Sequence, residues 1–187
     1  GRIPDATKTV SSDFKKTNSA VVLVGNLDTN SMGGSVYFDL NNLLGEKVPK
    51  IDLREFSKIA KSINKGIVNG DIFSCHDISE GGLLAALFEM CIGGDMGVSL
   101  RLPKNKREDY FLFNETAGAF LVEVENREVA KKLFGRLPFV ILGKTQKDLP
   151  AGRQEKTIDV WSNKKLFSAN LQDLKNAWQK PMKKIFP

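Results

Sequence analysis

A polar turn at residues 76–82, HDISEGG, holds the only histidine of the chain together with two acids, a serine and two glycines. Residues 71–75 before it predict a strand, and residues 82–92 after it predict a helix. A helix that begins after a glycine-rich turn offers free backbone N–H groups and the positive end of its dipole. Glycines also let a ligand approach the backbone closely. The turn therefore has the make-up of a phosphate or carboxylate site.

The same turn also has a purely structural interpretation. Asp77 or Ser79 would then cap the helix, and Gly81 and Gly82 would only permit a tight bend. His76 would be a hydrogen-bonded structural residue. The turn contains neither the lysine-bearing phosphate loop GxxxxGK[ST] nor the dinucleotide fingerprint GxGxxG. Taken alone, the composition of this turn fits both a ligand-binding site and a purely structural turn.

Two further turns of similar composition favour a cleft shared by all three. Residues 33–35, GGS, lead into a predicted helix, and residues 113–118, FNETAG, carry an acid and a glycine into a predicted strand. Each of them alone also fits an exposed loop. The candidate phosphate- or substrate-binding residues are Gly33, Gly34, Ser35, His76, Asp77, Ser79, Gly81, Gly82 and Glu115. No catalytic and no metal-binding residue is assigned, and backbone N–H groups would carry the anion.

The elements that must position these turns alternate along the chain. Apolar runs predict strands at residues 19–25, 71–75, 96–102, 119–125, 138–144 and 157–160. Helical periodicity or capping predicts helices at residues 35–44, 52–67, 82–92, 106–112, 127–134 and 169–185. Residues 145–156 predict an exposed loop, and Pro181 should kink or end the last helix. This order predicts an α/β (α+β) fold in which helices cover a sheet in a layered sandwich.

Composition narrows the class of protein. Of 187 residues, 41% are hydrophobic and 27% charged, which is ordinary for a soluble domain. No apolar run is long enough to span a membrane and no signal peptide is visible, so we expect a cytoplasmic protein. The net charge of +6 comes from scattered basic residues, which disfavours nucleic acid as a partner. Cys75 and Cys91 are expected to be reduced core residues, with a disulfide or metal pair as the alternative.

Together these motifs resemble one enzyme family. HDISEGGLLAALFEM is similar to the HD(V/I)S(D/E)GGL…ALAEM motif of the phosphoribosylformylglycinamidine synthase family, in its second C-terminal-type domain. Further matches follow in order from about residue 4 to 160: PDATKTVSSDFK, VVLVGNLDTNSMGGSVYF, VPKIDL, LFNETAGAFLVEV and FVILGKT. Two positions depart from the family pattern. Val36 replaces an acid after the GGS, and no arginine follows Glu115, which weakens the transfer of ligand contacts.

The resemblance implies a fold like the C-terminal domain of AIR synthase, with a mixed sheet, over residues 1–165, followed by a helical extension over 166–187. It also implies a reaction, in which the full enzyme uses ATP, Mg²⁺ and ammonia from a glutaminase to convert formylglycinamide ribonucleotide into the amidine. The family binds ATP and Mg²⁺ mainly on N-terminal-type domains, for which no counterpart is visible in the sequence. Those domains and the glutaminase are the expected partners.

Three consequences and alternatives accompany this resemblance. We expect the chain to be one module of a longer enzyme and to have no synthase activity alone. A non-catalytic structural or interaction domain is the alternative of a different class. Another member of the same superfamily, such as AIR synthetase, selenophosphate synthetase or a HypE-like maturation factor, is the alternative within it.

Overall fold

The computed structural model describes residues 3–104, 107–146 and 155–186. Most of the loop predicted at residues 145–156 lies outside the described residues. Within the described residues, no helix combines the length and the apolar character that a membrane crossing requires.

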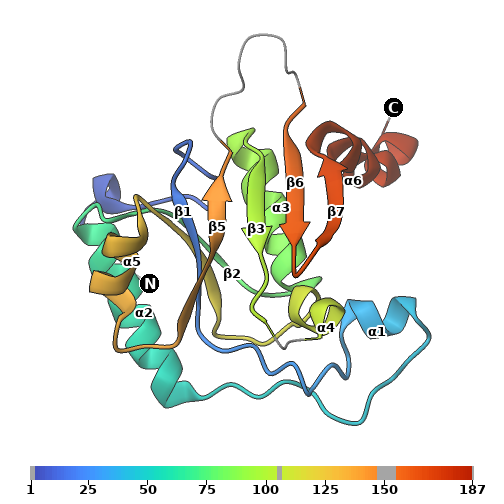
Figure 1. Ribbon diagram of the computed structural model, residues 1–187, viewed down its shortest axis with the longest axis horizontal. Helices are drawn as coiled ribbons and strands as arrows, with labels where there is room; N and C mark the ends of the chain where they lie inside the picture. Colours follow the sequence, from blue (N-terminus) through green and yellow to red (C-terminus); the bar gives the residue numbers. More distant parts are fainter. Residues whose placement is uncertain (1–2, 105–106, 147–154, 187) are drawn as a thin grey trace.

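Seven strands form one mixed sheet in the order β2-β4-β1-β5-β3-β6-β7 (Figure 1). The strands are β1 (Ala20–Val24), β2 (Ile72–Asp77), β3 (Val98–Arg101), β4 (Phe120–Val124), β5 (Phe139–Thr145), β6 (Thr157–Trp161) and β7 (Lys165–Asn170). β3 and β6 run parallel, in a register that pairs Val98 with Ile158, and the other described neighbours run antiparallel. β1 lies inside the sheet and every one of its residues is buried, which explains its continuous apolar sequence.

Helices cover both faces of this sheet (Figure 1). The helical segments are η1 (Ala6–Lys8), α1 (Val36–Leu40), α2 (Leu53–Val68), α3 (Gly82–Gly94), α4 (Glu108–Leu112), α5 (Arg127–Phe134) and α6 (Leu171–Ile185). On one face, α2 and α5 pack Ile59 and Phe134 against β1 residues such as Val22. On the other face, α3 packs Leu83 and Leu87 against the opposite side of the same strands. The predicted layered sandwich is therefore confirmed.

Local sequence rules account well for α2. Its apolar residues recur along one stripe, of which Ile59 and Ile63 are buried in the core. Asp52 caps it, because its side chain accepts the N–H groups of Arg54 at 2.9 Å and Glu55 at 3.1 Å. The Glu55 side chain turns away from this cap and accepts a hydrogen bond from Asn26 Nδ2 at 3.2 Å. The helix is therefore fixed by its cap and its buried stripe.

The C-terminal part of the chain differs from the sequence prediction in two respects. Residues 165–170 form β7, which was not predicted and which pairs with β6. α6 begins at Leu171, where Asn170 caps it by accepting the N–H of Gln172 at 2.8 Å. Pro181 lies inside α6 and does not end it, because the helix continues to Ile185. The division of the chain after residue 165 stays a prediction.

Candidate functional site

One carboxylate joins the three glycine-bearing turns. Glu115 lies between α4 and β4, and its Oε1 atom accepts two backbone hydrogen bonds of 2.9 Å each. One N–H group belongs to Val36, the first residue of α1, and the other belongs to Gly81, the N-cap residue of α3. The structure therefore brings the turns at 33–36, 81–82 and 113–118 together at one place.

The glycines of the second turn allow two segments of backbone to pack closely. Gly81 and Gly82 both have positive φ, +78° and +71°. A Cβ atom on Gly82 would lie 2.5 Å from the carbonyl carbon of Phe113 and 2.8 Å from the carbonyl oxygen of Asn114. The Gly82 N–H donates to the Ser79 carbonyl at 3.0 Å. At Gly82, the lack of a side chain makes room for the 113–114 backbone.

The predicted helix cap in this turn was wrong. Neither Asp77 nor Ser79 caps α3, because the N-cap position falls on Gly81, which has no side chain. Glu115 accepts the N–H group of that residue, although it lies 34 positions further along the chain. Asp77 instead stands exposed at the end of β2. α3 therefore begins without a side-chain cap, and Glu115 holds the N-cap residue itself in place.

The first turn keeps one of its glycines open to solvent. The Ser35 side chain caps α1, accepting the Phe38 N–H at 3.3 Å. The N–H groups of both glycines are used inside the protein, since that of Gly33 donates to the Lys47 carbonyl at 2.7 Å and that of Gly34 to the Leu44 carbonyl at 3.3 Å. Gly34 is exposed with φ +75°, and a Cβ atom there would have its nearest neighbour 3.9 Å away. Of the turn's two glycines, Gly34 is therefore the one that a ligand from solvent could approach.

His76 is tied to its surroundings through both ring nitrogens. Its Nε2 atom lies 2.8 Å from Glu89 Oε2 on α3, and its Nδ1 atom lies 2.7 Å from the Asp77 carbonyl. The side chain is only 15% exposed. These contacts fasten the end of β2 to α3 and fit the structural interpretation of this histidine.

An apolar groove of about 520 Å³ adjoins the bridging carboxylate. Val36 and Gly81, the two residues that donate to Glu115, both line it. Its other walls come from α1, α3, α6 and the last two strands, with the apolar side chains of Leu40, Leu84, Phe88, Phe113, Phe167 and Leu174. Part of its wall is open, since the Leu40 side chain is 76% exposed.

The described residues include no group of three or more His, Cys, Asp and Glu side chains placed to hold a metal ion. Cys75 and Cys91 are both free, as predicted. Burial raises the pKa of the Cys75 thiol to about 12, and nearby Asp77 adds to this effect. Burial also raises the pKa of the Cys91 thiol well above its ordinary value. Neither thiol is suited to nucleophilic chemistry near neutral pH.

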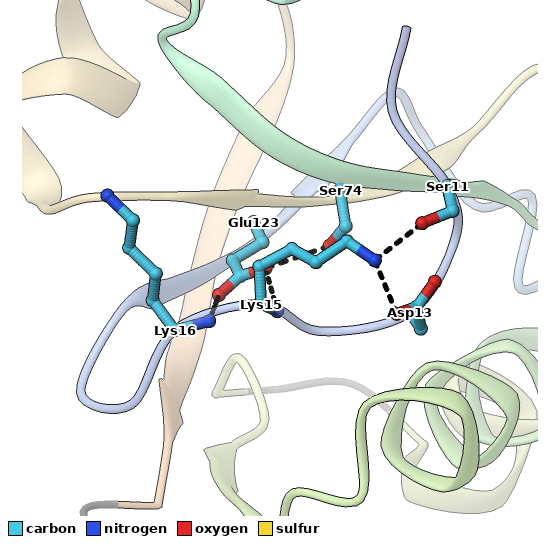
Figure 2. A network of polar contacts seen from close by, with 6 residues as sticks. All are labelled: Ser11, Asp13, Lys15, Lys16, Ser74 and Glu123. Carbon is cyan, nitrogen blue, oxygen red and sulfur yellow. Dashed lines mark hydrogen bonds and ion pairs between the residues drawn. The ribbon is translucent and has the colours of Figure 1, made fainter.

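A second carboxylate centre was missed by the sequence analysis (Figure 2). Glu123 lies in β4 and is completely buried. Its Oε2 atom accepts the N–H of Lys15 at 2.8 Å and the hydroxyl of Ser74 at 3.0 Å. Its Oε1 atom accepts the N–H of Lys16 at 2.9 Å and the hydroxyl of Ser19 at 2.6 Å. Four donors thus converge on one side chain and fasten residues 15–19 to the sheet.

The two lysines of this network direct their ammonium groups away from Glu123 (Figure 2). Lys15 Nζ donates to Ser11 Oγ at 2.5 Å and to the carboxylate of Asp13. The hydrogen bond from Lys15, and after it one from the Ser11 side chain, lower the pKa of Asp13. Lys16 Nζ lies 3.8 Å from the ring centroid of Phe73. The sequence signal for the network was an acid in the middle of the apolar strand FLVEV.

Comparison with known proteins places the chain in a family. Residues 16–151 match the family described as AIR synthase related protein, C-terminal domain. The chain is 32% identical over 194 residues to the phosphoribosylformylglycinamidine synthase subunit PurL of Deinococcus radiodurans, covering 99% of this chain and 25% of that protein. The subunit of the same name from Thermoanaerobacter sp. is 32% identical over 180 residues, covering 96% and 24%. The chain therefore spans about a quarter of the length of the curated relatives it matches.

Solved structures share the fold. The PurL of T. maritima complexed with FGAR superposes with a TM-score of 0.72 at 16% identity, over 90% of this chain and 30% of that one. The hydrogenase maturation protein HypE superposes with a TM-score of 0.58 at 15% identity, over 87% and 55%. The similarity confirms the predicted fold class.

Proposed function

The chain belongs to the family of AIR synthase related protein C-terminal domains, and on this premise we propose that it serves as such a domain in a phosphoribosylformylglycinamidine synthase. The enzyme would convert formylglycinamide ribonucleotide to the amidine in cytoplasmic purine biosynthesis, using ATP and ammonia. The support is that relatives from several bacteria, matched over nearly the whole chain, carry this name.

The observation that carries this proposal is the meeting of three turns at Glu115. We assign to the surrounding residues the wall of a cleft that receives a phosphate-bearing ligand. Gly34 would stand where the ligand approaches, the buried Ser35 would fix the turn behind it, and the turn at 76–82 would form the facing wall. Phosphoryl transfer asks a protein mainly for positioning and electrostatic stabilisation, and fixed turns would supply the positioning.

The remaining parts of the reaction would come from partners. We assign ATP and Mg²⁺ mainly to an N-terminal-type domain, and ammonia to a glutaminase domain or subunit. Exposed apolar side chains on and after α1 support a covering partner, because Leu40, which lines the groove, is 76% exposed, Leu44 86% and Val48 61%. The N-terminal-type domain would then complete the cleft from the side of α1.

Calorimetry tests the proposal on the chain alone and on the chain joined to an N-terminal-type domain. We expect formylglycinamide ribonucleotide to bind the joined protein, and no turnover by the chain alone. Gly34→Val should weaken binding to the joined protein by about tenfold or more, because a side chain would stand where the ligand approaches. Gly70→Val is the matched control, since Gly70 has φ +76° and open space around it, and lies away from the cleft. Equal losses in the two variants would contradict the site.

A second candidate, a structural or interaction domain that binds no ligand, is favoured by one observation. The backbone of Gly82 packs against Phe113 and Asn114, and Glu115 already accepts the Val36 and Gly81 N–H groups. Protein acceptors thus already take the hydrogen bonds of N–H groups that an anion would otherwise accept. Absence of binding to the joined protein, together with stable association of the two domains, would select this candidate.

A further inference from the structure

The Glu115 carboxylate forms its hydrogen bonds with the protein's own backbone. A single oxygen, Oε1, receives both N–H groups, and these come from the beginnings of two different helices. A negative charge at such positions is favourable because helix N-termini carry partial positive charge. Hydrogen bonds to an ionised acceptor are also stronger than neutral ones. The Oε1 atom therefore links the beginning of α1 to the beginning of α3.

The backbone that carries Glu115 is itself held firmly. Its neighbour Asn114 is completely buried, and its Nδ2 atom donates to the carbonyls of Asp28 at 2.9 Å and Ser31 at 3.2 Å. Asn114 Oδ1 accepts the Thr116 N–H at 3.1 Å. Residues 28–31 lead directly into the first glycine turn. Asn114 thus anchors the loop before that turn, and Glu115 anchors the helix after it.

We propose that Glu115 is a positioning residue that couples the 33–36 turn to the 81–82 turn, so that a displacement of either turn is transmitted to the other. The coupling itself depends only on the contacts of Glu115. Its use in holding a ligand phosphate between the turns rests on the proposed function. A ligand that orders one turn would then order the other without touching it.

Hydrogen exchange on the 187-residue chain tests the coupling without any ligand. In Glu115→Ala, the amides of Val36 and Gly81 lose their shared acceptor, and both should exchange about tenfold faster or more. Glu115→Gln keeps an acceptor oxygen and should restore part of the protection. Glu80→Ala, which removes an exposed acid from the same region, is the matched control and should leave both amides unchanged. Faster exchange at only one of the two amides would overturn the proposal.

A double-mutant cycle separates coupling from simple structural support. Gly34→Val perturbs the first turn and should change exchange at Gly81 in the otherwise unaltered chain. In the double variant Gly34→Val with Glu115→Ala, the Gly81 amide should exchange at the same rate as in Glu115→Ala alone. An equal response in both backgrounds would overturn the coupling. Loss of ligand binding by the joined protein would refute the proposed function and leave these exchange results intact.

Discussion

Two glutamates at β4, Glu115 and Glu123, have different structural roles. Glu115 stands before β4 and uses one oxygen to bridge two turns, whereas Glu123 stands within β4 and uses both oxygens to collect four donors. Glu115 is partly exposed and Glu123 is completely buried. The three turns are therefore joined through one partly exposed carboxylate beside an open groove, while Glu123 is enclosed in the core. The difference separates the region proposed to receive a ligand from one that fixes the fold.

The largest expected effect is at Glu123. Glu123→Ala would remove the shared acceptor of two partly buried N–H groups and of the Ser19 and Ser74 hydroxyls, and we expect it to lower the free energy of unfolding by about 4 kcal/mol. Urea denaturation measures this loss. Glu125→Ala removes an exposed acid just beyond the same strand and should change stability by less than about 0.5 kcal/mol. Similar losses in the two variants would show that the buried network contributes little.

The next effect is at the turn end, where backbone packing can be separated from backbone conformation. Gly82→Ala combines left-handed strain with overlap against Phe113 and should destabilise by about 3 kcal/mol. Gly70 has nearly the same φ, +76° against +71°, with no atom within 4 Å of an added Cβ. Gly70→Ala should therefore cost only the strain, about 1 kcal/mol. Thermal or urea unfolding of the pair would reveal the packing contribution as the difference.

Glu115→Ala should destabilise less than Glu123→Ala. It removes two hydrogen bonds to a charged group at a partly exposed position, and we expect a loss of about 2 kcal/mol. Urea unfolding alongside Glu123→Ala places the two carboxylates on one scale. A loss at Glu115 equal to or greater than that at Glu123 would reverse the proposed contrast between the two ends.

The smallest effect is expected at Asp77, because it caps no helix in the structure. Asp77→Ala should change the free energy of unfolding by less than about 0.5 kcal/mol. Asp52 does cap α2, so Asp52→Ala should cost about 1 kcal/mol. If the two aspartates proved equal in denaturation experiments, the conclusion that Asp77 caps no helix would be wrong.

Local patterns predicted the parts of the fold that depend on local physics. The apolar run at residues 19–25 became β1, and Asp52 and Ser35 cap the helices they precede. β7 was missed because KLFSAN contains few strong strand-formers and lies beside a predicted helix. The candidate turns were found from composition, since glycines and acids gather there. The three turns meet at Glu115, which supports the expectation that they lie together. Their role in ligand binding stays a prediction.

The contacts that were missed join residues far apart in sequence. Glu115 meets Gly81 across 34 positions and Val36 across 79, and Glu123 meets Lys15 across 108. No rule based on neighbouring residues assigns such partners. An acid in the middle of a buried strand, as in FLVEV, is the one local sign that a distant set of donors must exist.

The parallel ladder between β3 and β6 has a consequence for the way the molecule opens. It joins residues 157–186 to the sheet through four registered pairs, Val98 to Arg101 against Ile158 to Trp161. β6, β7 and α6 contact one another closely, and α6 reaches α3 mainly through its first turns. We expect β6, β7 and α6 to unfold and refold together as one cooperative unit, while β2, β4, β1 and β5 stay folded.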